Sequence, residues 1–142
     1  MGQFSATQAV AAFRARRRNI TAQRMAVFRA LERAEGHPTA EELHAGLRDG
    51  VPGFALKTVY LILHELAHLR LIEPIPLPAG ATRWEGNTTP HGHFVCDACR
   101  RVVDLPVDPT VLLPMVQRAG RRFDMRRASL IVHGKCNRCA AR

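Results

Sequence analysis

Apolar residues recur at helical spacing through the first half of the chain, and polar residues fill the positions between them. The pattern predicts helices over residues 5–17, from Thr21 to about residue 34, from Thr39 to about Arg48, and over 56–69. Thr39 and Glu42 have the spacing of a capping box. In this motif the threonine hydroxyl accepts a hydrogen bond from a free backbone amide at the helix start, and the glutamate carboxylate reaches back toward the capping residue. In the fourth helix the predicted inward positions are Val59, Ile62, Leu63, Leu66 and Leu69.

The pattern changes to alternation after the fourth helix. Residues 71–76 and 81–86 predict two strands joined by a turn at 78–80. Helices followed by a two-stranded hairpin predict a winged helix-turn-helix. Beyond it we expect short strands near 93–96 and 101–105, a helix near 109–121 and a strand near 125–133. The fold class is therefore α+β, with a winged-helix domain over 1–86, a hinge over 87–91 and a small α/β domain over 92–142.

Length and composition indicate a globular protein without a membrane span. The chain has 142 residues, of which 46% are hydrophobic, enough for one ordinary domain or two small ones. It has no uninterrupted apolar stretch of about 18 residues, so we expect no membrane span. The first residues lack the order of a secretory signal, which predicts a cytoplasmic protein.

Charge suggests an anionic partner. The formal net charge is +9, and residues 1–30 contain six arginines and no acid. A basic arm that leads into helices is a common way to hold nucleic-acid phosphates. Charge alone leaves a second interpretation open, in which this is a solvated basic face.

The four cysteines form two C-x-x-C pairs, Cys96 with Cys99 and Cys136 with Cys139. In a cytoplasmic chain such pairs indicate a metal site more than disulfides. Four thiolates complete a tetrahedron around zinc and leave no open position, so the zinc is expected to be structural. Reduced cysteines in a core, or iron held as in rubredoxin, are the alternatives.

A second group of candidate ligands lies around the hinge. An H-x-H motif at a bend, His91 and His93, can aim both imidazoles at one ion, and Glu85, Asp104 and His37 add further donors. Taken singly, each has an ordinary interpretation as a surface carboxylate, a loop histidine or a charge at a helix end. Together they offer three nitrogens and two oxygens, a set suited to iron(II), manganese(II), cobalt(II) or zinc.

The chain resembles the Fur family of metalloregulators from about Ile20 to Cys139. The matching segments are residues 20–24, 34–43, 57–60, 83–85, 90–105 and 133–139. The resemblance implies a homodimer with an N-terminal winged-helix half and a C-terminal dimerisation half. It also implies a regulatory ion held by His37, Glu85, His91, His93 and Asp104. It further implies that the fourth helix, with Tyr60, enters the major groove of double-stranded DNA, at a palindromic operator.

The branch within the family depends on the two carboxylates. At its position Glu85 resembles the residue of the iron-responsive Fur type, which usually has an acid, often glutamate, at both carboxylate positions. Asp104 resembles the peroxide-sensing PerR type, which has aspartates. We interpret the chain as a PerR-like repressor loaded with iron(II) or manganese(II), in which peroxide modifies His37 or His91. The alternative is an iron- or manganese-responsive Fur-type repressor of metal uptake genes. The neighbours expected of a third metal site are replaced by Pro90, Gly92 and Ala128, and no cysteine is left for a zinc-sensing site.

The predicted contacts with DNA come from the basic arm and the fourth helix. Leu61 departs from the family, which commonly has Arg or Asn there, so the polar interaction is either missing or replaced by an apolar one with a thymine methyl. The rival class is a metalloenzyme. Five protein ligands would leave at most one open position on the metal, so we expect no enzymatic activity. A zinc-ribbon module would leave the helix-turn-helix without a role. The predicted DNA-binding residues are Arg16, Arg17, Arg18, Arg24, Lys57, Thr58, Tyr60 and His64.

Overall fold

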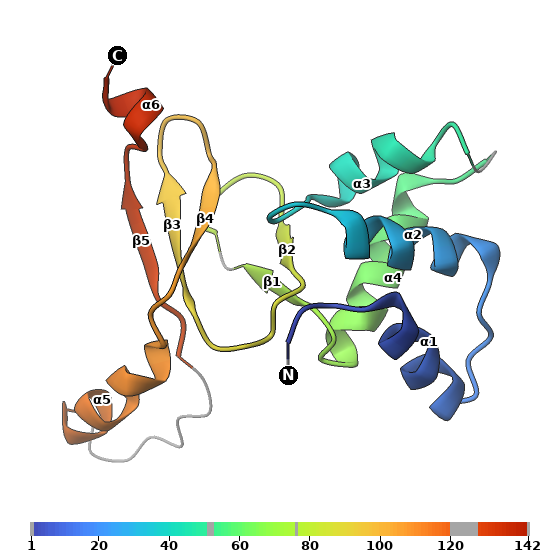
Figure 1. The fold of residues 1–142 in the computed structure, drawn as a ribbon, viewed down its shortest axis with the longest axis horizontal. Coiled ribbons are helices and arrows are strands. Elements are labelled where there is room, and N and C mark those ends of the chain that lie inside the picture. Colours follow the sequence, from blue (N-terminus) through green and yellow to red (C-terminus); the bar gives the residue numbers. More distant parts are fainter. Residues whose placement is uncertain (1, 51–52, 76, 120–127, 142) are drawn as a thin grey trace. The chain divides into compact units, whose positions relative to one another are not determined.

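The computed structural model describes residues 2–50, 53–75, 77–119 and 128–141, and divides the chain into two compact units (Figure 1). The first unit covers residues 1–89 and the second covers 90–142. No helix within the described segments is long and apolar enough to cross a membrane. Each unit is described by itself below.

The first unit is a winged helix-turn-helix. Its elements are α1 (Ala6–Ala15), α2 (Ala22–Arg33), α3 (Ala40–Leu47), α4 (Leu56–His68), β1 (Glu73–Ile75) and β2 (Arg83–Glu85). The predicted helices are confirmed, with ends shifted by no more than two residues. The two strands are shorter than predicted, and residue 76, within the first prediction, lies outside the described residues. Pro74 pairs with Trp84 in the middle of the ladder, and a proline has no amide to donate to it.

Local sequence signals account for the helix starts. The Thr21 hydroxyl accepts from the Arg24 amide and caps α2. At α3 the predicted capping box is confirmed, because Thr39 Oγ1 accepts from the Glu42 amide at 3.1 Å and the Thr39 amide donates to the Glu42 carboxylate at 2.9 Å. These contacts satisfy amides that a helix start otherwise leaves without partners.

The core of the first unit is aromatic and aliphatic. Phe13 and Phe28 meet edge to face, with ring centroids 5.2 Å apart, and Trp84 of β2 is also buried. Leu69, predicted to point inward, lies just beyond the end of α4 and is only half-buried. The inner face of α4 consists of Val59, Ile62, Leu63 and Leu66, all buried as predicted.

The second unit is a three-stranded sheet with short helices. Its elements are β3 (Gly92–Cys96), β4 (Val102–Leu105), the 3-10 helix η1 (Pro109–Leu112), α5 (Leu113–Ala119), β5 (Ile131–Gly134) and α6 (Asn137–Ala140). The strand order is β4-β3-β5, with β4 antiparallel and β5 parallel to β3. β4 runs back along β3, so the connection from β4 to β5, which contains η1 and α5, begins and ends at the same end of the sheet and passes to the other side of β3.

Two predictions for this unit change in detail. The predicted helix near 109–121 begins as a 3-10 turn, where the Asp108 side chain accepts from the Thr110 amide and Pro109 follows the cap. The strand predicted near 125–133 starts only at Ile131, and residues 120–127 lie outside the described part of the chain. The short helix α6, which the hydrophobic pattern did not predict, carries the last cysteine.

Candidate metal centres

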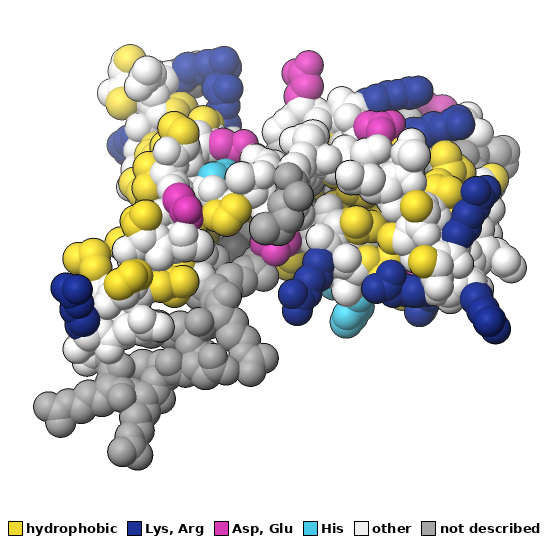
Figure 2. Space-filling model, turned by 60° about the horizontal axis from the view of Figure 1, so that its bottom comes forward, with side chains coloured by type: hydrophobic (Ala, Val, Ile, Leu, Met, Phe, Trp, Pro, Cys, Tyr) yellow, Lys and Arg dark blue, Asp and Glu magenta, His cyan; other side chains and the backbone are white. Residues whose placement is uncertain are grey.

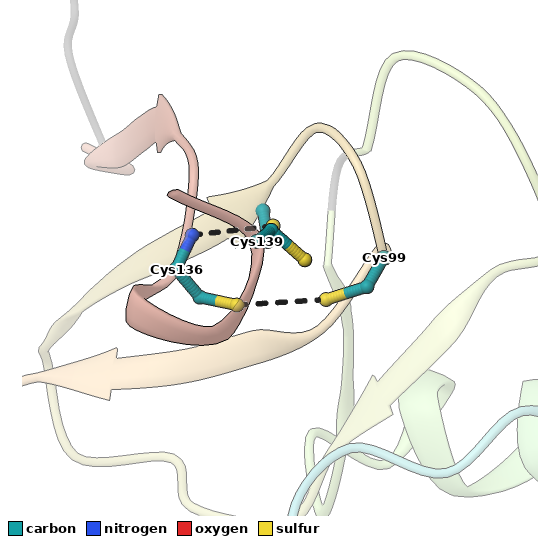
Figure 3. Close-up of side chains that lie close together, drawn as sticks. Cys99, Cys136 and Cys139 are labelled. Carbon is teal, nitrogen blue, oxygen red and sulfur yellow. Dashed lines mark hydrogen bonds between the residues drawn. The ribbon is translucent and has the colours of Figure 1, made fainter. Parts of the chain in front are cut away.

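The four cysteines converge at one end of the second unit's sheet. Their Sγ atoms all lie within 4.8 Å of one another. Cys99 Sγ and Cys136 Sγ are 3.8 Å apart, and Figure 3 shows the two side chains turned toward each other. Sulfur atoms about 2.3 Å from one tetrahedral ion are about 3.8 Å from each other, whereas a disulfide needs about 2.05 Å. The geometry therefore fits a metal bound by four sulfurs.

The sheet brings the two cysteine pairs together. Cys96 ends β3 and faces Gly134 at the end of β5, and the Asp97 amide donates to the Gly134 carbonyl at 2.8 Å. Parallel pairing thus places residues about 40 positions apart in the chain side by side. Asp97 and His133 form a second connection across the same end, with 3.2 Å between Oδ1 and Nδ1.

Backbone amides favour thiolate at this cluster. The amides of Cys136, Cys99 and Ala98 point at Cys96, and lower the pKa of its thiol to about 6. The Cys139 amide likewise lowers the pKa of Cys136. Cys139 lies next to these sulfurs, which raise its pKa to about 12, because a further negative charge beside them is unfavourable. A divalent cation would remove that repulsion and let all four sulfurs bind as thiolates.

In the first unit, His37 and Glu85 form a buried pair. His37 Nε2 lies 2.7 Å from Glu85 Oε2, and both residues are 7% exposed. The loop before α3 is bonded along β2: the Trp84 amide donates to the Pro38 carbonyl at 3.0 Å, and Arg83 Nη1 donates to the His37 carbonyl at 2.7 Å. These bonds bring together residues 48 positions apart in the chain.

In the second unit, His91, His93 and Asp104 form another group of donors. The two imidazole centroids are 4.5 Å apart, and Asp104 Oδ1 lies 3.4 Å from His91 Nε2 and 3.8 Å from His93 Nε2. Asp104 is the cross-strand partner of His93 in the β3–β4 ladder, and His91 lies just before β3 begins. Atoms about 2.1 Å from one ion are typically about 3–4 Å apart, so these three fit a common metal.

The arginines of the first unit divide into two kinds. Arg16 and Arg17, at the end of α1, are exposed. The Arg24 guanidinium instead binds both oxygens of the Glu65 carboxylate and lies 5.0 Å from the centroid of the Phe13 ring. Arg18 binds the same carboxylate. The position of Arg24 therefore gives no support to the prediction that it contacts DNA, and the hydrophobic pattern did not reveal Glu65 as its ion-pair partner.

The outer face of α4 carries the remaining predicted DNA contacts. Lys57 and His64 are exposed, and Thr58 and Tyr60 are half-buried. The Tyr60 hydroxyl donates to Glu41 of α3 at 2.7 Å, and this bond lowers the pKa of Glu41 and raises the pKa of Tyr60. His64 stands edge to face with the buried Trp84 of the wing, with centroids 5.4 Å apart. α4 is thus held by α3 on one side and by the wing on the other.

Comparison with known proteins agrees with this arrangement. Residues 16–114 match the model of the ferric uptake regulator family. The peroxide-responsive repressor PerR of Staphylococcus aureus is 25% identical over 132 residues, covering 93% of this chain and 89% of that protein. The Helicobacter pylori ferric uptake regulator Fur has a similar fold, with a TM-score of 0.76 at 19% identity over 99% of this chain and 97% of that one.

A second solved structure is also similar. The Vibrio cholerae ferric uptake regulator is 26% identical with a TM-score of 0.70, covering 88% of this chain and 97% of that one. The family match spans most of the chain and includes the wing, the first cysteine pair and most of the candidate ligands. The chain therefore belongs to the ferric uptake regulator family, and it is a metal-responsive, DNA-binding transcription regulator and not an enzyme.

Proposed function

We propose that this protein is a peroxide-sensing repressor that binds a palindromic operator as a homodimer when loaded with iron(II) or manganese(II). The observation that carries the proposal is the pair of converging donor groups, His37 with Glu85 and His91 with His93 and Asp104. Similarity to the Staphylococcus aureus peroxide-responsive repressor PerR supports the peroxide branch.

A regulatory ion would take donors from both units. We propose that His37 and Glu85 bind the same ion as His91, His93 and Asp104, which gives three nitrogens and two oxygens. An ion that binds this complete set more tightly than either part shifts the protein toward the conformation in which all five donors meet. That conformation would fix the spacing between the α4 helices of a dimer, and hence the match to two half-sites.

Peroxide sensing needs the imidazoles of this set. Bound iron(II) would supply one-electron chemistry with hydrogen peroxide, which manganese(II) does not. His37 and His91 are the proposed targets, and addition of one oxygen to either imidazole would weaken its nitrogen as a donor. Loss of the ion would then release the operator.

The cysteine cluster would hold a structural zinc ion. Cys96, Cys99, Cys136 and Cys139 occupy all four positions of a tetrahedron, so the ion has no position open for a substrate. Its binding energy would instead hold the end of β3 to the turn after β5, in a unit with a small hydrophobic core of its own.

The second unit also offers a surface for dimerisation. Hydrophobic side chains gather on the face of this unit that Figure 2 shows, on β4, β5 and the segment of η1 and α5. Exposed hydrophobic side chains that gather on one surface are typical of a protein–protein interface, and we propose that a second copy of the chain covers them. The exposed members are Val103, Val107, Val111, Leu112, Met115, Val116 and Val132.

DNA binding is assigned to the first unit. We propose that α4 lies in the major groove, where Lys57, Thr58, Tyr60 and His64 face the DNA. Arg16, Arg17 and Arg18 of the basic arm contribute phosphate contacts. Arg24 is left out of this set, because its guanidinium is bound to Glu65 and its side chain is only 20% exposed. Arg18 binds the same carboxylate but is kept, because its side chain is 51% exposed.

Operator binding under four conditions tests the proposal. The protein is loaded with iron(II) or manganese(II), and each form is measured with and without dilute hydrogen peroxide. We expect peroxide to release the iron form, to leave the manganese form bound, and to add one oxygen to a peptide that contains His37 or His91. Release without modified histidines would contradict peroxide sensing through them.

The second candidate function is a Fur-type repressor of metal uptake genes. Glu85 favours it, because its longer carboxylate is the one that the iron-responsive branch typically carries. This alternative predicts that either ion supports operator binding and that peroxide leaves both peptides unmodified. The same four conditions therefore separate the two functions.

A further inference from the structure

Leu61 lies on the outer face of α4 and is 57% exposed. Among the described residues of the first unit, it is the only large hydrophobic side chain that is mostly exposed. The other exposed hydrophobic side chains of the described segments belong to the second unit. More than half of this side chain stays in water in the free protein, so contact with a partner would bury apolar surface that the fold itself leaves exposed.

The side chains around Leu61 suit a nucleic-acid partner. Lys57 lies one helical turn before it and His64 one turn after it, and both are exposed. The acid on the next turn is Glu65, whose carboxylate is bound by the guanidinium groups of Arg18 and Arg24. A bare carboxylate here would repel phosphates, and the two arginines compensate its charge. Among the α4 side chains around Leu61 the charge is therefore neutral to positive. A second acid, the exposed Glu41 of α3, lies beside Tyr60 and accepts from its hydroxyl at 2.7 Å.

The chemistry of base edges limits what Leu61 can recognise. In the major groove the 5-methyl group of thymine is the one apolar feature, and the other edges present hydrogen-bond donors and acceptors. A leucine placed against those polar edges would displace water from them without offering a partner, which is unfavourable. Against a thymine methyl it buries apolar surface on both sides.

We infer that Leu61 is a specificity-determining residue that contacts a thymine methyl group, and so selects thymine at one position of each half-site. This inference rests on the proposed placement of α4 in the major groove. The inference assigns base selectivity to the hydrophobic contact of Leu61, whereas Lys57 contributes only positive charge. Polar side chains at this position would read a different base.

Methyl deletion tests the inference directly. An operator is first selected from randomised duplexes with the full-length, manganese-loaded protein. Each thymine is then replaced by deoxyuridine, which lacks only the methyl group, and affinities are measured at one fixed salt concentration. We expect one position per half-site to be methyl-sensitive, with binding about fourfold weaker per methyl and about 15-fold weaker when both half-sites are changed.

The variants assign the effect to a residue. Leu61→Ala should bind the thymine and deoxyuridine operators equally at the sensitive position. Its slope of log affinity against log salt should stay the same, because no phosphate contact is removed. Lys57→Ala is the matched control one turn away, and should lower affinity and the salt slope while keeping the methyl effect. Leu61 is exposed, so circular dichroism should show an unchanged fold in Leu61→Ala.

The outcomes separate this inference from the proposed function. If the protein selects an operator but no thymine is methyl-sensitive, the inference is wrong and the repressor assignment stands. The same holds if Leu61→Ala keeps the full methyl effect. If no operator is selected with either metal, the placement of α4 on DNA fails and the inference fails with it.

Discussion

The Arg24 guanidinium of α2 binds both carboxylate oxygens of Glu65 on α4, with Nη2 at 3.0 Å from one and 2.9 Å from the other. The same guanidinium donates to the Asn19 carbonyl at 2.6 Å and lies over the Phe13 ring. A single side chain therefore joins the end of the basic arm, α1, α2 and α4. Both partners are about three-quarters buried, so water screens the pair less than an exposed one.

Arg24→Ala should lower the free energy of unfolding by about 1–3 kcal/mol, since it removes charged hydrogen bonds and the contact with Phe13. Urea unfolding measures this. Arg29→Ala, an exposed arginine on the same helix, is the control and should change stability by less than about 0.5 kcal/mol. In a double-mutant cycle with Glu65→Gln, the two substitutions should be non-additive. Additive effects would mean that the pair contributes nothing beyond its separate side chains.

The exposed arginines should behave differently from Arg24 toward DNA. Arg16 and Arg17 replaced together by alanine should flatten the dependence of log affinity on log salt, by about one unit for each phosphate that the protein no longer contacts. The affinities for operator and for random DNA should fall by about the same factor. Arg24→Ala should leave the slope unchanged. A double variant with the wild-type slope would mean that this end of α1 is a solvated surface.

Cys96→Ser should abolish binding of the structural zinc that we propose for the cysteine cluster. Because zinc binding in small sites contributes roughly 10 kcal/mol or more to folding, the second unit should unfold and the dimer dissociate. Metal analysis and sedimentation measure the two effects. Ala98→Ser adds a hydroxyl inside the same turn without removing a ligand, and should keep both zinc and dimer. A folded, dimeric Cys96→Ser protein without zinc would contradict the assignment.

His37→Ala should abolish metal-dependent operator binding while zinc and the dimer remain, since it removes one donor of the regulatory set. His37 is buried, so Asp104→Ala, at an exposed position, provides a second test with less risk to the fold. Asp108→Ala, an exposed aspartate of the same unit, is the matched control. If both ligand variants still needed added metal to bind the operator, the regulatory ion would lie elsewhere.

The Tyr60–Glu41 bond predicts a pH effect that NMR can follow. The Tyr60 hydroxyl lowers the pKa of Glu41 in the folded protein, so the bond contributes stability above the unfolded pKa and loses it as the pH falls through the folded value. In Tyr60→Phe the Glu41 carboxyl should titrate at higher pH than in the wild type. Asp108, whose pKa is lowered by Thr110, should keep its midpoint in both proteins. An unchanged Glu41 midpoint would mean that the bond is absent in solution.

Features that depend on near neighbours could be predicted from the sequence. Thr39 and Glu42 lie three residues apart, so their spacing alone predicted the capping box that begins α3. The apolar spacing of α4 predicted its buried face for the same reason, and each C-x-x-C pair identified a turn with two sulfurs. These signals are local and need no knowledge of the rest of the chain.

Features whose partners are distant in sequence came only from the packing of the folded chain. Nothing near Arg24 marks Glu65, 41 residues later, as its partner, so charge alone assigned this arginine to DNA. Asp104 lies beside His93 only because of the register of β3 with β4, and Glu85 meets His37 only because the loop before α3 bonds to β2. A charged side chain can contact a phosphate, bind a metal or form an internal ion pair. Its neighbours in the sequence do not distinguish among these roles. The packing of whole elements makes that choice.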